Sequence, residues 1–304
     1  MPDALDSKPT LIERGLRLVT DVRAGEAPLV LSLTLNVFLL LTAYYIIKPV
    51  REALILTLDG GAEYKAYSSG AIAIVLLGAV PLYGLFVDRL PRLKLVVGVT
   101  LFFASHLVLF FLASQLESVR PLLGILFYIW IGLFNLMVVA QLWSFANDLY
   151  DVEQGKRLFP IVALGASIGA AAGSQIASLL VDPLGVYVLL LVSAGVLVGC
   201  SYLFVVSERQ SSILKAKKRT ELEAAQRAAL AAGEAAGSVP VTAAAAPAAP
   251  VGSSPSAAGA SREGGFALVF RYRYLLAIAF FTLVYNWVNS NGEYMLGKLV
   301  REAA

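Results

Sequence analysis

The chain alternates between long apolar runs and short polar segments. Apolar runs of membrane length occupy residues 28–47, 68–87, 95–113, 122–146, 159–181 and 184–206. A helix needs about 20 consecutive apolar residues to cross the hydrocarbon core of a bilayer. The pattern therefore predicts six transmembrane helices within residues 28–206, and a further apolar run at 275–288 predicts the beginning of a seventh.

The segments outside these runs divide the chain into four predicted parts, of which residues 28–206 form the six-helix bundle. Residues 1–27 are predicted to be a tail, either an amphipathic helix on the membrane surface or a solvated segment. Residues 207–265 begin charged and helix-prone and continue as Ala, Gly, Pro and Ser without apolar periodicity, which predicts a partly disordered linker. Residues 266–304 are predicted to start a second bundle.

Composition and charge placement agree with a membrane protein. The chain is 58% hydrophobic and 15% charged, which is far from a soluble domain of this length and predicts an all-α polytopic membrane protein. Lys and Arg are concentrated in the N-terminal tail, in the connections near residues 88–94 and 147–157, and in residues 207–273. Because cytoplasmic segments are enriched in Lys and Arg, the N-terminus and the linker are predicted to face the cytoplasm.

The sequence shows no arrangement that points to catalysis. There is no cluster with metal-ligand spacing and no nucleophile–base pair, so we expect no enzyme, no metal and no cofactor. The single cysteine, Cys200, lies in an apolar run and cannot form an intrachain disulfide. The basic residues near 215–219 are too few and too interrupted to predict nucleic-acid binding, and a lipid bilayer is the expected partner.

Glycines recur every four residues in the fifth run, at Gly165, Gly169 and Gly173. On a helix these positions form one flat face on which another backbone can approach closely. Plain packing of a helical bundle is one interpretation, and a sliding or gating face is the other.

Charged residues follow the first run directly. Lys48 and Arg51 are three residues apart, which predicts that they share a helical face, and Glu52 comes next. Cations at membrane depth can offset the desolvation of a phosphate ligand. The alternative is that these side chains extend to the membrane surface. Tyr44 is a candidate to stack on a base, although tyrosines are common at membrane interfaces.

Polar residues in and after the fourth run are further candidates. Asn135 and Gln141 are expected to face the bundle, where they either join helices by hydrogen bonds or contact a solute. The polar segment that follows carries five charged residues, which we expect to form either a cytoplasmic gate or a plain solvated turn: Asp148, Asp151, Glu153, Lys156 and Arg157.

The predicted plan resembles the major facilitator architecture, in which two six-helix halves surround a central site. The segment Gly84-x-x-x-Asp88-Arg89-x-x-Arg92-x-Lys94 resembles the loop between helices two and three of that superfamily. The resemblance implies a major-facilitator-like bundle, a C-terminal half-bundle as partner, and a gating role for Asp88 and Arg89. A basic loop on the cytoplasmic side is the alternative interpretation.

A more specific resemblance covers roughly residues 30–206. The stretch from Phe145 to Asp148, followed by Val152-Glu153-x-Gly155-Lys156-Arg157, is similar to the nucleotide antiporters of plastids and intracellular bacteria, the ATP/ADP carriers unrelated to the mitochondrial ones. Residues 44–52 resemble the first helix of that family. Tyr285-Asn286 with Glu293 resembles its seventh.

This resemblance implies a distant bacterial antiporter that exchanges ATP for ADP, or a related nucleotide, across the inner membrane. Arg51 falls where the family has a functional lysine, and Lys48 where it usually has arginine. The resemblance implies Lys48, Arg51 and Glu293 as substrate-binding residues and places Glu52 among the gating charges. The candidates Tyr44, Asn135 and Gln141 given above complete the expected substrate site. Two alternatives stay open: a transporter of another anionic solute, and a non-transporting anchor or sensor of the same fold.

Overall fold

The computed structural model describes residues 20–23, 25–87, 89–235 and 269–303. All elements in these ranges are helical: α2 (Ala27–Leu56), α3 (Gly61–Val87), α4 (Arg92–Ala113), η1 (Glu117–Val119), α5 (Arg120–Leu149), α6 (Val152–Leu184), α7 (Val188–Ala235) and α9 (Arg273–Ala303). Six of them, α2 to α7, are long and apolar enough to cross a membrane. The chain is thus an all-α integral membrane protein, as the apolar runs predict.

The helices extend beyond the apolar runs. α2 continues through Pro49 to Leu56, so Lys48, Arg51 and Glu52 lie within the helix rather than after it. Between α5 and α6 the connection is only Tyr150 and Asp151, much shorter than the polar turn of about eleven residues that the hydropathy pattern suggests.

A capping box explains the early start of α6. Asp151 accepts a hydrogen bond from the backbone of Gln154, and the Gln154 side chain accepts one from the Asp151 backbone amide. Such a reciprocal pair satisfies amide groups that are otherwise free in the first turn of a helix. The charged residues that follow Asp151 therefore lie on the first turns of α6.

α7 is the longest helix, with 48 residues. At a rise of about 1.5 Å per residue it is about 72 Å long, more than twice the hydrocarbon thickness of a bilayer, about 30 Å. The helix-prone segment 207–227 is indeed helical, and residues 228–235, which composition assigns to a disordered linker, continue the same helix. The tail at residues 1–19 and the rest of the linker, residues 236–265, lie outside the described residues.

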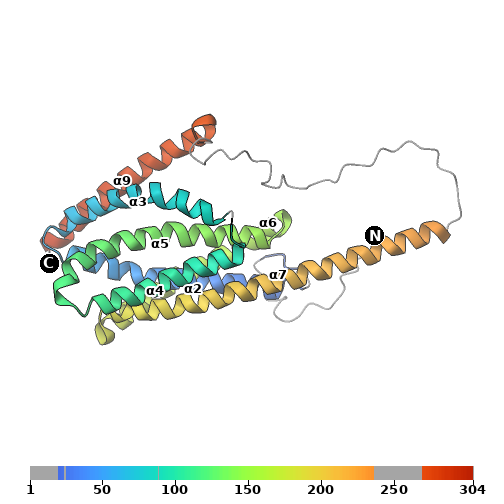
Figure 1. The fold of residues 1–304 in the computed structure, drawn as a ribbon, viewed down its shortest axis with the longest axis horizontal. Helices are drawn as coiled ribbons and strands as arrows, with labels where there is room; N and C mark the ends of the chain where they lie inside the picture. Colours follow the sequence, from blue (N-terminus) through green and yellow to red (C-terminus); the bar gives the residue numbers. More distant parts are fainter. Residues whose placement is uncertain (1–19, 24, 88, 236–268, 304) are drawn as a thin grey trace. The chain divides into compact units, whose positions relative to one another are not determined.

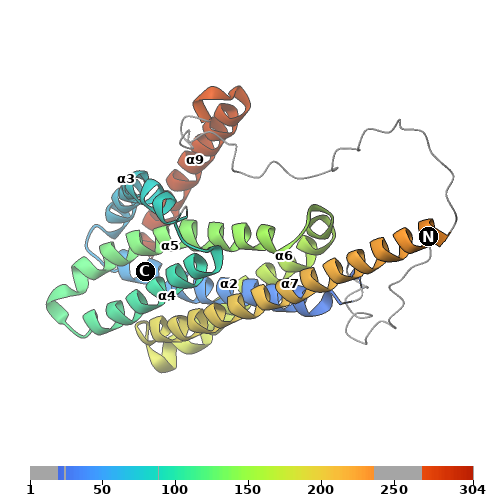
Figure 2. The ribbon, with the colours of Figure 1, turned by 45° about the vertical axis from the view of Figure 1, so that its right-hand side comes forward.

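The chain divides into two compact units, with the boundary in α7 after Arg219. In the first unit the helices run alongside one another in alternating directions (Figure 1, Figure 2). α2 is the most enclosed, since 56% of its most apolar stretch is buried, compared with none of that of α3. The apolar face of α3 is therefore available for contact with lipid or with another protein surface. The second unit contains α9 as far as Leu299; this helix lies at the expected seventh span and is not among the six candidate spans.

Candidate functional site

Polar clusters lie at both ends of the first unit. Because neighbouring helices alternate in direction, the start of α2, the end of α5 and the start of α6 share one end, which we call the Glu26 end. The end of α2 and the starts of α3 and α5 share the opposite end, which we call the Glu52 end.

At the Glu52 end, one carboxylate is shared by two cations. Oε1 of Glu52 accepts a hydrogen bond from Nη2 of Arg51, and Oε2 accepts one from Nζ of Lys65 at 2.7 Å. The Arg51 and Lys65 side chains are each 12% exposed, and that of Glu52 is 26% exposed. This largely buried cluster thus contains two cations that share one carboxylate.

The ring of Tyr128 holds the Arg51 side chain in place. Its guanidinium lies over the ring of Tyr128 in α5, 4.5 Å from the ring centroid, which is within range of a cation–π interaction. The Tyr128 hydroxyl lies 3.3 Å from the hydroxyl of Ser69 in α3. Nε of Arg51 is buried without a hydrogen-bond partner. The guanidinium is thus fixed between helices and retains one unused donor.

Glycines bring the three helices close enough to form this cluster. A Cβ on Gly61 would lie 2.3 Å from the backbone oxygen of Ile55, and one on Gly124 would lie 2.6 Å from that of Leu54. The turn before α3 contains Gly60 with φ of 78°, a left-handed conformation that favours glycine. Larger residues at these positions would move α3 and α5 away from the end of α2.

Lys48 and Tyr44 are placed differently from Arg51. Lys48 is exposed, and its Nζ lies 5.5 Å from the ring centroid of Tyr45, so the structure does not bring it into the Arg51 cluster. Tyr44 is 8% exposed and stacks on Phe134 of α5 at 6.1 Å. The two positions are three residues apart on one continuous helix, but the Lys48 side chain is exposed while that of Arg51 packs against Tyr128 of α5.

The polar residues of α5 show one anomaly. Gln141 is 3% exposed, yet neither its amide nitrogen nor its amide oxygen has a hydrogen-bond partner. Most buried side-chain amides in proteins are bonded. The side chain of Tyr83 in α3 lies beside Gln141, but no hydrogen bond of ordinary geometry joins them in this conformation. Asn135 lies half-buried on the same helix.

At the Glu26 end, a buried ion pair joins α2 to α6. Arg157 holds the Glu26 carboxylate with both terminal nitrogens, at 3.1 and 3.3 Å. Gln154 donates to the same carboxylate at 2.9 Å, and the backbone amide of Arg23 donates at 3.1 Å. Glu26 is only 2% exposed. Burial raises the pKa of the Glu26 carboxyl, but the hydrogen bonds from Arg157 and Gln154 outweigh burial and hold the pKa below its usual value.

The other charges near this connection do not form one network. Asp148 pairs with Arg92 of α4 at 2.7 Å, and Asp151 pairs with Lys218 of α7 at 3.7 Å. These side chains are 41–68% exposed, and exposed pairs typically contribute about 0–1 kcal/mol. The charged residues of this segment thus form separate pairs, each with a different helix or segment, and of the three pairs described here Arg157–Glu26 is the buried one.

Some predicted gating residues do not join any of these pairs. Glu153 and Lys156 are exposed, and within the described ranges neither forms an ion pair. Arg89 is exposed in the connection before α4. Asp88 lies outside the described residues, as does the side chain of Glu293. Glu26 was not identified from the sequence, because the charge that it binds is 131 residues away.

The glycine face of α6 packs closely on the backbone of α2, the approach that both interpretations of the glycine repeat require. A Cβ on Gly169 would lie 2.3 Å from the oxygen of Phe38, and one on Gly173 would lie 2.5 Å from that of Thr42. Gly165 is similarly close to Thr34. The Thr42 hydroxyl also donates to the oxygen of Gly169 at 3.2 Å.

Hydrogen bonds from polar side chains join α2 to α7 along another face of α2. The hydroxyl of Ser207 donates to Ser32 at 3.1 Å, and the side-chain amide of Asn36 donates to the backbone oxygen of Cys200 at 3.1 Å. The hydroxyl of Ser193 lies 3.4 Å from the oxygen of Ala43. Ser193, Cys200 and Ser207 recur every seven residues, a signal in the sequence that could have identified this face.

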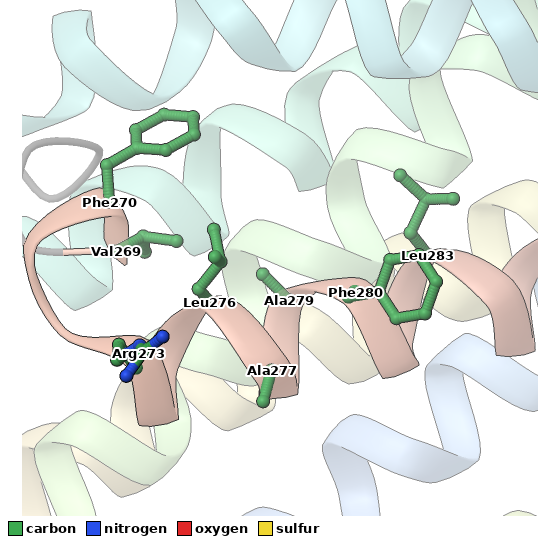
Figure 3. Close-up of a pocket in the computed structure, with 8 residues that line it drawn as sticks. All are labelled: Val269, Phe270, Arg273, Leu276, Ala277, Ala279, Phe280 and Leu283. Atoms are coloured by element: carbon green, nitrogen blue, oxygen red, sulfur yellow. The ribbon is translucent and has the colours of Figure 1, made fainter.

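The second unit has a hollow of about 600 Å³ along the start of α9 (Figure 3). Its lining is apolar except for one arginine: Val269, Phe270, Arg273, Leu276, Ala277, Ala279, Phe280 and Leu283. Such a surface suits a lipid chain or another apolar helix better than a charged solute.

Two further indications of function would be metal ligands in the described residues and similarity of the chain to known proteins. Among the residues that the structure describes, no group of three or more His, Cys, Asp or Glu side chains could hold a metal ion. No family model matches the sequence, and neither a curated protein nor a solved structure matches it.

Proposed function

We propose that this chain belongs to a secondary transporter of anionic solutes that has a major-facilitator-like fold and works by alternating access. The observation that carries the proposal is Arg51, which lies near the end of α2, just beyond the apolar run 28–47, with a side chain only 12% exposed. A buried guanidinium is costly, and in the helices of membrane proteins such a residue commonly marks a substrate or ion pathway. The two cations of the Arg51–Glu52–Lys65 cluster favour an anion as the solute.

The proposed solute is a nucleotide, with ATP exchanged for ADP, because of the resemblance in residues 44–52 and 145–157. A guanidinium binds phosphate oxygens with two parallel hydrogen bonds, which suits Arg51 to this task. Following the same resemblance, a second half-bundle would complete the site. The distribution of Lys and Arg supports an orientation in a bacterial inner membrane with the Glu26 end at the cytoplasm.

Uptake of labelled ATP into vesicles containing the full-length protein would test this function. Stimulation of uptake by ADP inside the vesicles is expected for an exchanger. Arg51→Gln should weaken ATP binding by roughly ten- to hundredfold, since losing a charge-assisted hydrogen bond costs about 1.5–3 kcal/mol. Arg51→Lys should recover part of the affinity, because the charge returns without the planar fork.

Arg120→Gln is the matched control. Arg120 lies at the same end of the bundle, but its side chain is 46% exposed and its partner Glu117 is 3.8 Å away. It should therefore bind ATP like the wild type. Equal ATP affinity of wild type and folded Arg51→Gln would remove Arg51 from the site.

A membrane anchor or sensor is the second candidate function, and the length of α7 favours it. The helix continues from its apolar part to Ala235, and residues 215–228 are exposed, which would suit a rigid connection to another domain. If vesicles that contain the folded protein take up no more ATP than empty vesicles do, with or without internal ADP, this function is favoured over transport.

A further inference from the structure

We propose that Glu52 is an internal competitor of the transported anion: in the empty protein it occupies Arg51, and when the anion arrives it leaves Arg51 and stays bound to Lys65. This inference rests on the proposed function and names a regulator of the same site. It concerns the carboxylate between the two cations, rather than the cations themselves.

The two interactions of Glu52 can break separately. Arg51 binds one carboxylate oxygen and Lys65 binds the other, at 2.7 Å. Movement of Glu52 away from Arg51 therefore does not require loss of the bond to Lys65, which comes from a different helix, α3.

The Arg51 side chain is held in a position to receive the anion. Its guanidinium rests on the Tyr128 ring, 4.5 Å from the centroid, and this contact does not depend on Glu52. Nε of Arg51 has no hydrogen-bond partner. Glu52 is also the most exposed member of the cluster, at 26% compared with 12% for each cation. An anion that enters from solvent would meet this carboxylate before it reaches the guanidinium.

Charge compensation explains why such a competitor is needed. An arginine that is largely buried without a counter-charge is strongly unfavourable, so an empty site requires a counter-charge. Glu52 supplies it without the substrate. When an anion displaces Glu52 from Arg51, Glu52 stays paired with Lys65 and the anion binds Arg51. Each of the two cations therefore has an anionic partner in both states.

The proposal predicts opposite effects on ADP binding for substitutions of Glu52 and of Lys65. Glu52→Gln removes the competitor and should tighten ADP binding roughly tenfold, the effect of one charge-assisted hydrogen bond. Lys65→Gln frees Glu52 to bind Arg51 alone and should weaken ADP binding. In the double variant the effect of Lys65→Gln should disappear, because Lys65 acts through Glu52.

The measurement is equilibrium binding of labelled ADP to the purified full-length protein, with Glu117→Gln as the control. Glu117 is a carboxylate at the same end, and its side chain is 87% exposed and 3.8 Å from Arg120. This control should bind like the wild type, which separates a local competition from a general loss of negative charge. Glu52→Asp retains the charge with a shorter reach and should give an intermediate gain, which provides a second test if Glu52→Gln does not fold.

The outcomes separate this inference from the proposed function. If the wild type binds ADP but folded Glu52→Gln or Glu52→Asp binds it with equal or lower affinity, the competition is overturned. The proposal of anion transport then still stands. A loss in Lys65→Gln that persists in the double variant would also overturn it, because Lys65 would then contact ADP directly. If neither ADP nor orthophosphate binds to folded wild type, the proposed function fails and the competition fails with it.

Discussion

Replacing Gly169 by alanine is expected to separate α6 from α2. The added Cβ would lie 2.3 Å from the backbone oxygen of Phe38 and 3.0 Å from its carbonyl carbon and Cα. Carbon–oxygen contacts between packed backbones are normally about 3.3–3.6 Å. One helix would have to move by about 1 Å at this point, since the obstructing atoms belong to the backbone of α2 and cannot rotate away as a side chain can.

Two opposing effects set the magnitude. Overpacking of a tight interface typically costs about 1–3 kcal/mol, and the 3.2 Å bond from Thr42 to the oxygen of Gly169 would be weakened as well. Alanine favours a helix over glycine by about 1 kcal/mol. Gly195 of α7 isolates this second effect, because a Cβ there would meet nothing within 4 Å. Gly195→Ala should therefore be neutral or stabilising, and Gly169→Ala destabilising.

The single cysteine provides the assay. Cys200 is fully buried, so a fluorogenic thiol reagent would react with it in detergent only as the bundle unfolds. A change of 1 kcal/mol shifts the melting temperature by about 2–4 °C for a domain of 150–250 residues. Gly169→Ala should therefore melt several degrees below the wild type. If both glycine variants melt at the wild-type temperature, the close packing of α2 on α6 is refuted.

Two further predictions concern charge and orientation. The pKa of Glu26 is lower in the folded protein than in the unfolded chain, where it is about 4.3. The stability that Glu26 contributes is therefore fully present above the unfolded pKa and is lost as the pH falls through the folded pKa. Glu26→Gln should accordingly show a smaller fall in melting temperature below about pH 5 than the wild type. A variant as acid-sensitive as the wild type would contradict this assignment. For orientation, a cysteine at Lys156 should react with an impermeant reagent only from the cytoplasm, and one at the exposed Glu63 only from outside. Labelling with the opposite sidedness would invert the topology.

The amino-acid sequence by itself determined the class of the protein and part of its packing. Apolar runs of membrane length predicted α2 to α7, because the transfer of apolar side chains out of water depends on local composition alone. The glycines at 165, 169 and 173 predicted the face of α6 that packs on α2, because a repeat of four residues places them on one side of any helix.

Tertiary structure decided which charges meet. Arg157 binds Glu26 across 131 residues, and Arg51 packs on Tyr128 of another helix rather than beside its neighbour Lys48. These partners depend on how the helices approach one another, which periodicity does not specify. The same holds for Gln141, for which the sequence leaves an interhelical bond and a solute contact both open, and whose buried amide the fold places beside Tyr83 of α3. Local patterns thus determine which segments enter the membrane, and the packing of distant helices determines the polar clusters within it.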